Sequence, residues 1–129
     1  MLRLCLFICF LISLCQFSKG QHQNILISSS DYPEEPTIFI DPGNTQRIVA
    51  GANIDKFYYS GDGGYSWDQM VLFSPTLGVW GDPCVIMDIS GAIYFFHLSN
   101  PPNGEWIDRI VCQRSTDNGL SFNDGCGIG

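Results

Sequence analysis

Short runs of β-branched and aromatic residues alternate along most of the chain with clusters of Gly, Pro, Asn and Asp. After residue 20, no stretch keeps the apolar period of about 3.6 residues that an amphipathic helix requires. Runs of Val, Ile, Phe and Tyr that are bounded by turn-forming residues are typical of β-strands. The pattern therefore predicts an all-β fold for everything except the N-terminal segment.

The strand pattern occurs twice. One copy begins at Glu35 and the other at Asp82, and each copy offers four short strands. The second copy carries an insertion at residues 100–104, where Pro and Gly favour a loop over a strand. We expect this copy to lose its last strand at Gly129. A repeat of about fifty residues with four strands has the size and content of a β-propeller blade.

Each copy contains the octapeptide Ser-x-Asp-x-Gly-x-Ser-aromatic, at residues 60–67 and at residues 115–122. A short carboxylate can accept hydrogen bonds from its own turn, Gly tolerates positive φ, and Ser can cap the turn. We therefore expect a structural hairpin between the third and fourth strands of each copy. The residues that would build it are Ser60, Asp62, Gly64, Ser66 and Trp67, and then Ser115, Asp117, Gly119, Ser121 and Phe122.

This octapeptide is the Asp-box, and two boxes at equivalent points of two repeats make the chain resemble the sialidase-type (BNR-repeat) β-propeller superfamily. The likeness covers residues 35–122 and extends to the Glu-Pro and Asp-Pro openings of the first strands. It implies a ring of about six blades. Residues 35–129 would supply two of these blades, the second one truncated. Such a piece cannot close a propeller alone.

The resemblance also implies a chemistry. A sialidase of this family uses three arginines to grip the substrate carboxylate, a tyrosine nucleophile backed by a glutamate, and an aspartate acid/base. After residue 20 the chain offers Arg47, Arg109 and Arg114, and it lacks the Arg-Ile-Pro signature of the family. We expect Arg47 to be solvated at a strand edge, and the other two to lie on the surface. No cofactor is expected.

Four residues remain as candidates for contact with a ligand. Glu35 and Asp82 begin the innermost strands of the two copies and would lie near the mouth of a central channel. They are weak catalytic candidates, because a purely structural rule would also repeat a carboxylate at this position. Trp80 and Trp106 are candidate stacking platforms for a glycan.

The N-terminus has the layout of a secretory signal peptide, with Arg3 before an uncharged apolar run at residues 4–14 and small residues before Gln21. We assign residues 1–20 to this signal and residues 21–34 to a lead-in strand and linker. The apolar run is too short for a membrane span, which needs about 20 residues. The protein is therefore expected to be secreted, extracellular or at the cell surface. A lipoprotein anchored at Cys15 is the alternative.

Three of the six cysteines precede residue 20. Of the others, Cys84 and Cys112 could form a disulfide between neighbouring strands, which would leave Cys126 without a partner. We expect no metal site, because no Cys-x-x-Cys pair exists and the two histidines have no helpful spacing. The net charge of −7 becomes more negative when the signal is removed. Such a field disfavours nucleic acid and anionic lipid as partners.

Three hypotheses follow for function. The chain is the N-terminal part of an exported exo-α-sialidase-like glycosidase and is itself inactive. Alternatively, it belongs to a non-catalytic extracellular propeller that binds glycan, glycoprotein or another protein. As a third possibility, it is a short subunit that assembles with copies of itself. Its partners would be the remaining blades or further copies.

Overall fold

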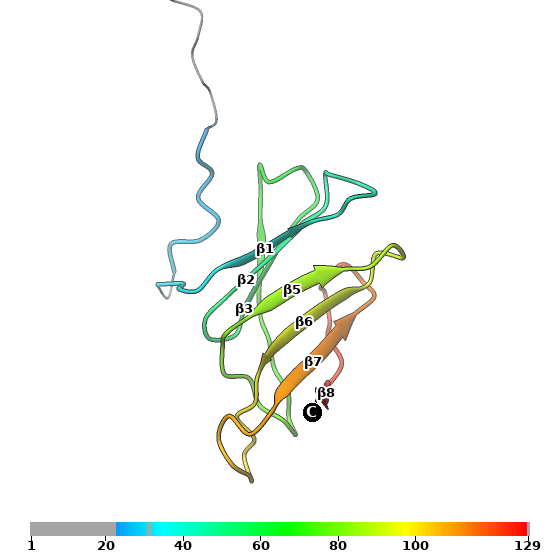
Figure 1. The fold of residues 1–129 in the computed structure, drawn as a ribbon. Helices are drawn as coiled ribbons and strands as arrows, with labels where there is room; N and C mark the ends of the chain where they lie inside the picture. The colour runs from blue at the N-terminus through cyan, green and yellow to red at the C-terminus, as the bar shows by residue number, and fades with distance from the viewer. Residues whose placement is uncertain (1–22, 31, 129) are drawn as a thin grey trace, which may run out of the picture.

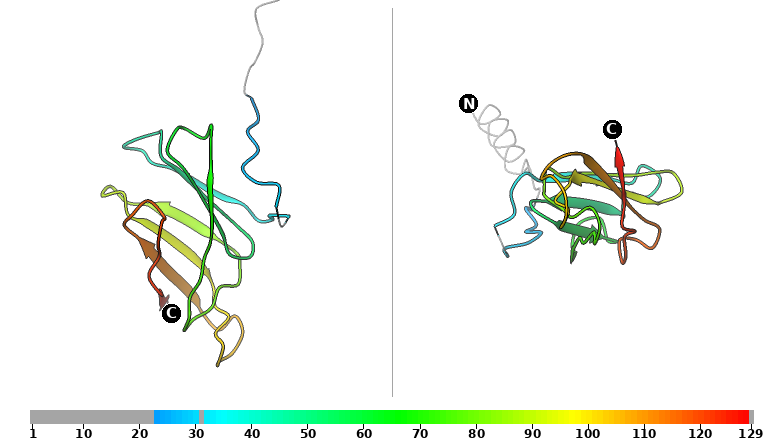
Figure 2. Two further views of the ribbon diagram at one scale, coloured as in Figure 1. Left: turned by 180° about the vertical axis from the view of Figure 1, so that it is seen from behind. Right: turned by 90° about the horizontal axis from the view of Figure 1, so that it is seen from below.

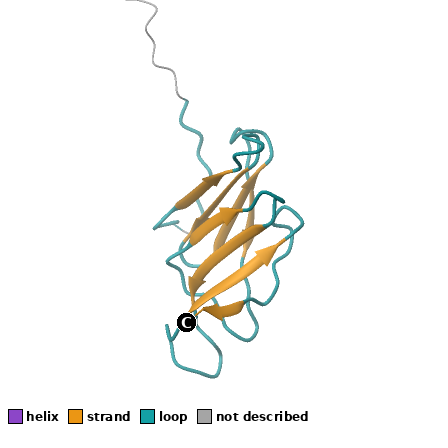
Figure 3. Cartoon of the chain, turned by 45° about the vertical axis from the view of Figure 1, so that its right-hand side comes forward, coloured by secondary structure: helices purple, strands orange, loops and turns teal. Residues whose placement is uncertain are grey.

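A computed structural model describes residues 23–30 and 32–128, which contain eight strands and no helix (Figure 3). The all-β prediction is confirmed. The expected signal peptide lies outside the described residues. Within the described ranges, no helix has the length and apolar character required to cross a membrane.

The first sheet is an antiparallel meander in which every strand pairs with its neighbour along the chain. Phe39 lies opposite Val49, and Phe57 lies opposite Met70, so alternate side chains of all four strands share one face. The strands are β1 (Thr37–Ile40), β2 (Ile48–Ala52), β3 (Lys56–Ser60) and β4 (Asp68–Val71).

The second sheet repeats this order in the second half of the chain (Figure 1). The expectation that its last strand is lost is wrong, because residues 126–128 pair with the third strand of the sheet. This pairing extends over only three positions, from Ile110–Ile128 to Cys112–Cys126. The strands are β5 (Cys84–Met87), β6 (Ile93–Leu98), β7 (Ile110–Ser115) and β8 (Cys126–Ile128).

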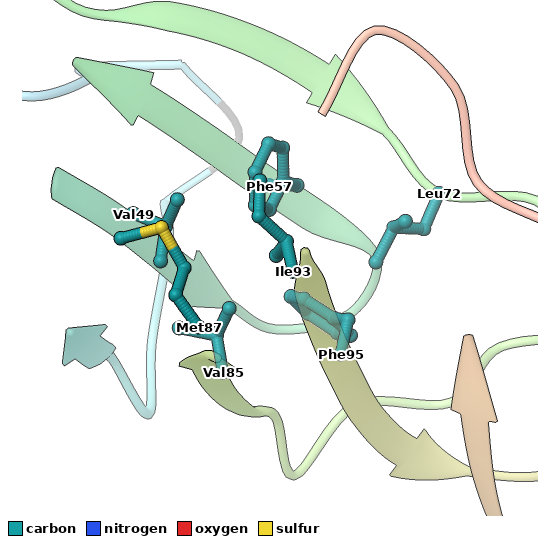
Figure 4. Close-up of a cluster of buried hydrophobic side chains, with 7 residues drawn as sticks. All are labelled: Val49, Phe57, Leu72, Val85, Met87, Ile93 and Phe95. Atoms are coloured by element: carbon teal, nitrogen blue, oxygen red, sulfur yellow. The ribbon is translucent and has the colours of Figure 1, made fainter. Parts of the chain in front are cut away.

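The two sheets pack face to face, as the right-hand view of Figure 2 shows. Their backbones come closest where β5 lies against β1 and β2. Between them lies one apolar cluster, in which the rings of Phe57 and Phe95 meet edge to face at 6.3 Å. Figure 4 shows the buried members of this cluster, which are Val49, Phe57, Leu72, Val85, Met87, Ile93 and Phe95.

Polar bonds lock the same interface. The side chain of Gln113 is fully buried, and its amide donates to the carbonyl oxygens of Phe73 (2.9 Å) and Asn123 (2.7 Å). Asp124 accepts a hydrogen bond from the hydroxyl of Ser74 at 2.7 Å. Both residues thereby tie the segment after β4 to the segment before β8, and the buried amide nitrogen of Gln113 is satisfied by backbone carbonyls.

The expected lead-in strand is absent from the described part of residues 21–34. Instead, this segment uses side chains to cover the second face of the first sheet. Ile27 packs against Ala50, Ala52 and Tyr58, which are buried there. One face of the first sheet thus meets the second sheet, and the other meets the N-terminal segment.

The proposed Cys84–Cys112 disulfide is wrong. Cys84 lies opposite Phe96, and Phe96 lies opposite Cys112, so strand β6 separates the two cysteines. Two strand spacings amount to about 9.6 Å, which exceeds the Cα separation that a disulfide permits. All three described cysteines have free thiols.

Candidate functional site

The meander places the loops of both sheets at two opposite ends (Figure 1). The loops that follow β1, β3, β5 and β7 lie at one end, which we call the Asp-box end because it carries residues 60–67 and 115–122. The starts of β1 and β5 lie at the other end, together with the β2–β3 and β6–β7 loops. We call this the Glu35–Asp82 end after the residues that precede the two strands.

The two Asp-boxes form the same hydrogen-bonded turn. In the first, the hydroxyl of Ser60 donates to Asp62 Oδ1 at 2.8 Å and accepts from the Gly64 N–H at 2.8 Å. Ser66 closes the turn, donating its N–H to Asp62 Oδ1 at 2.9 Å and its hydroxyl to Oδ2 at 2.6 Å. Each carboxylate oxygen is therefore satisfied inside the turn.

Every one of these bonds recurs in the second box. Ser115 Oγ donates to Asp117 Oδ1 at 2.7 Å and accepts from the Gly119 N–H at 2.9 Å. Ser121 donates its N–H at 2.9 Å and its hydroxyl at 2.6 Å to the same carboxylate. The donors lower the pKa of both aspartates to about 2, and the Ser66 and Ser121 hydroxyls are the largest cause.

The aromatic residues that end the boxes face different surroundings. Trp67 packs against the cluster beneath Ile27 and donates its indole N–H to the Gly64 carbonyl at 3.0 Å. Phe122 points between the sheets, where its ring lies 5.0 Å from Phe57 and 6.4 Å from Phe95. Each aromatic therefore packs toward the part of the chain that precedes its own sheet.

Arg47 joins the two sheets at the Asp-box end, which corrects the expectation of a solvated arginine. Its guanidinium bonds to Asp41 at 2.9 Å, to the Gly91 carbonyl at 3.0 Å and to Asn118 Oδ1 at 3.0 Å. Only 20% of its side chain is exposed, and Asp41 is buried. The first sheet thereby holds the turn of the second Asp-box.

The Glu35–Asp82 end is organised by Asn53, which lies between β2 and β3. Its side chain donates to the Glu35 carboxylate and accepts the Asp82 backbone N–H at 2.9 Å. Glu35 and Asp82 have nearly the same positive φ, 51° and 49°, which is uncommon for residues other than Gly. Both residues are exposed, and both bond to the Asn53 side chain, Glu35 through its carboxylate and Asp82 through its backbone N–H. This repeated strain at two acidic residues marks this end as a candidate site.

The two candidate tryptophans lie beside this network. Trp80 and Trp106 pack edge to face with ring centroids 5.4 Å apart, and Trp106 remains 59% exposed. Trp80 is two residues before Asp82, and the Gly81 between them has φ +78° and packs against Asn53. The tryptophan pair and the carboxylates are thus connected through consecutive residues.

The loop that carries Trp106 is fastened at its base. Ser99, which is fully buried, donates its hydroxyl to Asp108 at 2.7 Å, and Arg109 Nε donates to the same carboxylate at 2.9 Å. These donors, Arg109 first, lower the pKa of Asp108 to about 2. The Trp106 ring is therefore presented by a closed loop.

A hollow of about 570 Å³ opens at the same end, which is the size of a small-molecule site. It is lined by Tyr32, Glu34, Asn53, Ile54, Asp55 and Lys56.

No family model, curated protein or solved structure gives a significant match to this chain. The assignment of the site therefore depends on geometry.

The three arginines of the described residues do not converge. Arg47 lies at the Asp-box end, Arg109 pairs with Asp108 at the opposite end, and Arg114 lies over the ring of Tyr94 at 5.7 Å. Among residues 23–30 and 32–128, no three His, Cys, Asp or Glu side chains are placed to hold a metal ion. The Glu35–Asp82 end can offer carboxylates, an amide and aromatic faces, which suit neutral hydroxyl-rich ligands.

Sequence reasoning missed two residues that organise the ends of the molecule. Asn53 had no visible signal except its place in a turn, and its bond to Asp82 crosses 29 residues. For Arg47 the sequence predicts a solvated side chain, because its partner Asn118 is 71 residues away and no local pattern connects the two. The sequence feature related to these contacts is a glycine beside each of them. A Cβ atom at Gly81 would meet Asn53, and a Cβ atom at Gly91 would meet Arg47.

Proposed function

We propose that this chain forms two blades of an exported sialidase-like Asp-box propeller, and that its own contribution is to bind glycan. The observation that carries the proposal is the matched repeat. Two four-stranded meanders each place an Asp-box with the same set of hydrogen bonds between the third and fourth strands. The closest approach of β5 to β1 also suits blades that converge on a central axis.

The uncovered face of the second sheet supports further blades. Thr37 and Phe39 of β1 belong to the face that meets the second sheet. Cys84 and Ile86 hold the same places in β5, two and four residues after the strand-opening carboxylate, but their face is uncovered. We propose that another Asp-box sheet packs there, as the second sheet packs on the first. This open face carries Cys84, Ile86, Tyr94, Phe96, Ile110, Cys112, Arg114, Cys126 and Ile128.

The proposed ligand is a glycan at the Glu35–Asp82 end. Sugar rings stack on exposed aromatic faces such as Trp106, and carboxylates and amides accept or donate hydrogen bonds to hydroxyls. Hydrolysis by this chain alone is not proposed, because the arginine grip that the family resemblance implies is not assembled from Arg47, Arg109 and Arg114. An acid/base role of Glu35 or Asp82 in a complete ring stays a prediction from the sequence.

A binding measurement tests the proposal. We expect the purified chain to bind a neutral oligosaccharide in a ¹⁵N-NMR titration, and we expect Trp106→Ala to weaken binding about tenfold, a loss of about 1.4 kcal/mol. Tyr65→Ala is the matched control, because Tyr65 is 78% exposed but belongs to the first Asp-box. A fluorogenic sialoside should not be cleaved. Equal binding by Trp106→Ala and the wild type, or release of sialic acid by the chain, would contradict the proposal.

A further inference from the structure

Two cysteines on the open face lie directly opposite one another. Cys112 of β7 and Cys126 of β8 are paired in the register, so their side chains project from the same face of the sheet. The Cys126 thiol lies 3.9 Å from the Cys112 carbonyl oxygen. Directly opposite residues in antiparallel strands have Cα atoms about 4.5–5.5 Å apart. Disulfides use Cα separations of about 4.4–6.8 Å, so the pairing permits a bond without backbone movement.

Cys84 is excluded from this pair. It belongs to the same row across the sheet, but the side chain of Phe96 stands between it and Cys112. Cys126 has no cysteine on its other side, since β8 is the last strand of the sheet. Of the three described thiols, only Cys112 and Cys126 are on adjacent strands.

We propose that Cys112 and Cys126 form a disulfide that closes the base of the second Asp-box hairpin. The two residues are 14 positions apart, and the segment between them contains the whole box from Ser115 to Phe122. The bond would therefore enclose the turn that holds Asn118 against Arg47. This inference depends on strand register and is independent of the proposed glycan binding.

The bond can form by exchange with a low-molecular-weight disulfide such as oxidised glutathione. The thiolate of Cys126, which is exposed, attacks one glutathione sulfur and releases the first glutathione thiolate. Cys112 then loses its proton and attacks the Cys126 sulfur, releasing the second. Two protein thiols give up two protons and two electrons, and one glutathione disulfide becomes two thiols. Burial, and then the nearby Cys126, raise the pKa of Cys112, so closure should accelerate as pH rises.

Closing the hairpin should stabilise the second sheet. Its last strand pairs at only three positions, so β8 depends on contacts that are easily lost at a chain edge. A cross-link over a loop of this length reduces the freedom of the unfolded chain. The first hairpin has Phe57 paired with Met70 at the corresponding places and no cysteine.

Oxidation of the full chain tests the inference. The reduced protein is incubated with oxidised glutathione, alkylated, digested and mapped by mass spectrometry, which separates these cysteines from Cys5, Cys9 and Cys15. We expect one linked pair of peptides containing Cys112 and Cys126, and a midpoint of thermal unfolding about 10 °C higher than that of the reduced protein. Cys84→Ser, which leaves the pair intact, should behave as the wild type.

Cys126→Ser should lose both the linked peptide and the shift in midpoint. Cys112→Ala is a second variant, which removes the other thiol of the same bond. The inference is overturned if Cys112 is linked to Cys84, or if intermolecular dimers through Cys126 are the main product. It is also overturned if the oxidised wild type has the same midpoint of thermal unfolding as Cys126→Ser.

Discussion

In the two Asp-box turns, hydrogen bonds to the carboxylates of Asp62 and Asp117 take the place of backbone pairing between strands. Each accepts three bonds from two serines that flank it in the sequence. Since the donors stabilise the charged form, the carboxylates stabilise their turns more when ionised than when protonated.

This dependence predicts loss of stability in acid. The folded pKa of both aspartates is about 2, below the ordinary value of 3.8. Their contribution is therefore fully present above pH 3.8 and is lost as pH falls from 3.8 toward 2. Urea unfolding between pH 7 and pH 2 should show this slope, and the double variant Asp62→Asn, Asp117→Asn should flatten it.

Part of the slope should remain in the double variant, because the pKa values of Asp88 and Asp108 are lowered to about 2 as well. Asp68→Asn removes an exposed carboxylate outside both turns and serves as the control. A double variant with the full wild-type slope would show that the Asp-box carboxylates do not stabilise the fold.

The Asp-boxes could be predicted because all of their bonds join residues at most four positions apart. A local motif contains its own partners. The bonds by which Arg47 and Asn53 join the two sheets could not be predicted in the same way, because those partners, Gly91 and Asn118 for Arg47 and Asp82 for Asn53, come from the other repeat. Their roles arise only when the two sheets meet.

At the scale of elements, the turn of the second Asp-box is shaped to fit the first sheet. Gly119 has φ +84°, and a Cβ there would lie 2.2 Å from Cε1 of Phe57. Gly63, in the first box, has a similar φ of +77°, but its nearest neighbour is the flexible end of Gln46 at 3.4 Å. Substitution of either glycine should therefore introduce backbone strain, but only substitution of Gly119 should also introduce a steric clash.

We expect Gly119→Ala to lower the free energy of unfolding by about 3–5 kcal/mol, since left-handed strain and overpacking add. Gly63→Ala should cost about 1–2 kcal/mol, because only the strain applies. Denaturant titration monitored by circular dichroism measures both. Equal losses would mean that the second box does not press against Phe57. Adding Phe57→Leu to Gly119→Ala should recover part of the loss, which tests the contact if the single variant is poorly folded.

Most strands could be predicted from the sequence, since apolar runs between turn residues indicated four strands in the first copy and three in the second, and all seven are observed. The errors have a common cause, which is that contacts with other parts of the molecule decide whether these two segments form strands. Residues 126–128 have little strand character of their own, and β7 supplies the edge that makes them a strand. Residues 25–27 are apolar, but they form no ladder, and Ile27 instead packs its side chain on a face of the first sheet.

At the scale of the whole molecule, the second sheet has one covered and one open face. Ile86, Ile110 and Ile128 are 38%, 48% and 48% exposed on the open face. Contiguous apolar surface of this kind promotes association. The proposed neighbouring blade would remove it from water.

We expect the isolated chain to self-associate through this face, and Ile86→Lys to shift it toward the monomer in sedimentation velocity at equal concentration. Ile89→Lys adds the same charge to the β5–β6 turn, where Ile89 is fully exposed, and should leave association unchanged. If both variants associate as the wild type does, the open face is not a packing surface. Melting temperatures within a few degrees would show that both variants are folded.

The strand order has a consequence for how the protein is made. In both sheets every strand after the first pairs with the one synthesised just before it, so each pairing closes only a short loop. Loop closure is then inexpensive, and folding can keep pace with translation. The first sheet can form while the second is still being synthesised, with Phe57 incompletely covered until Phe95 and then residues 119–122 arrive. The last contacts to form are then those that join the two repeats, and the nascent chain is most exposed to aggregation during that interval.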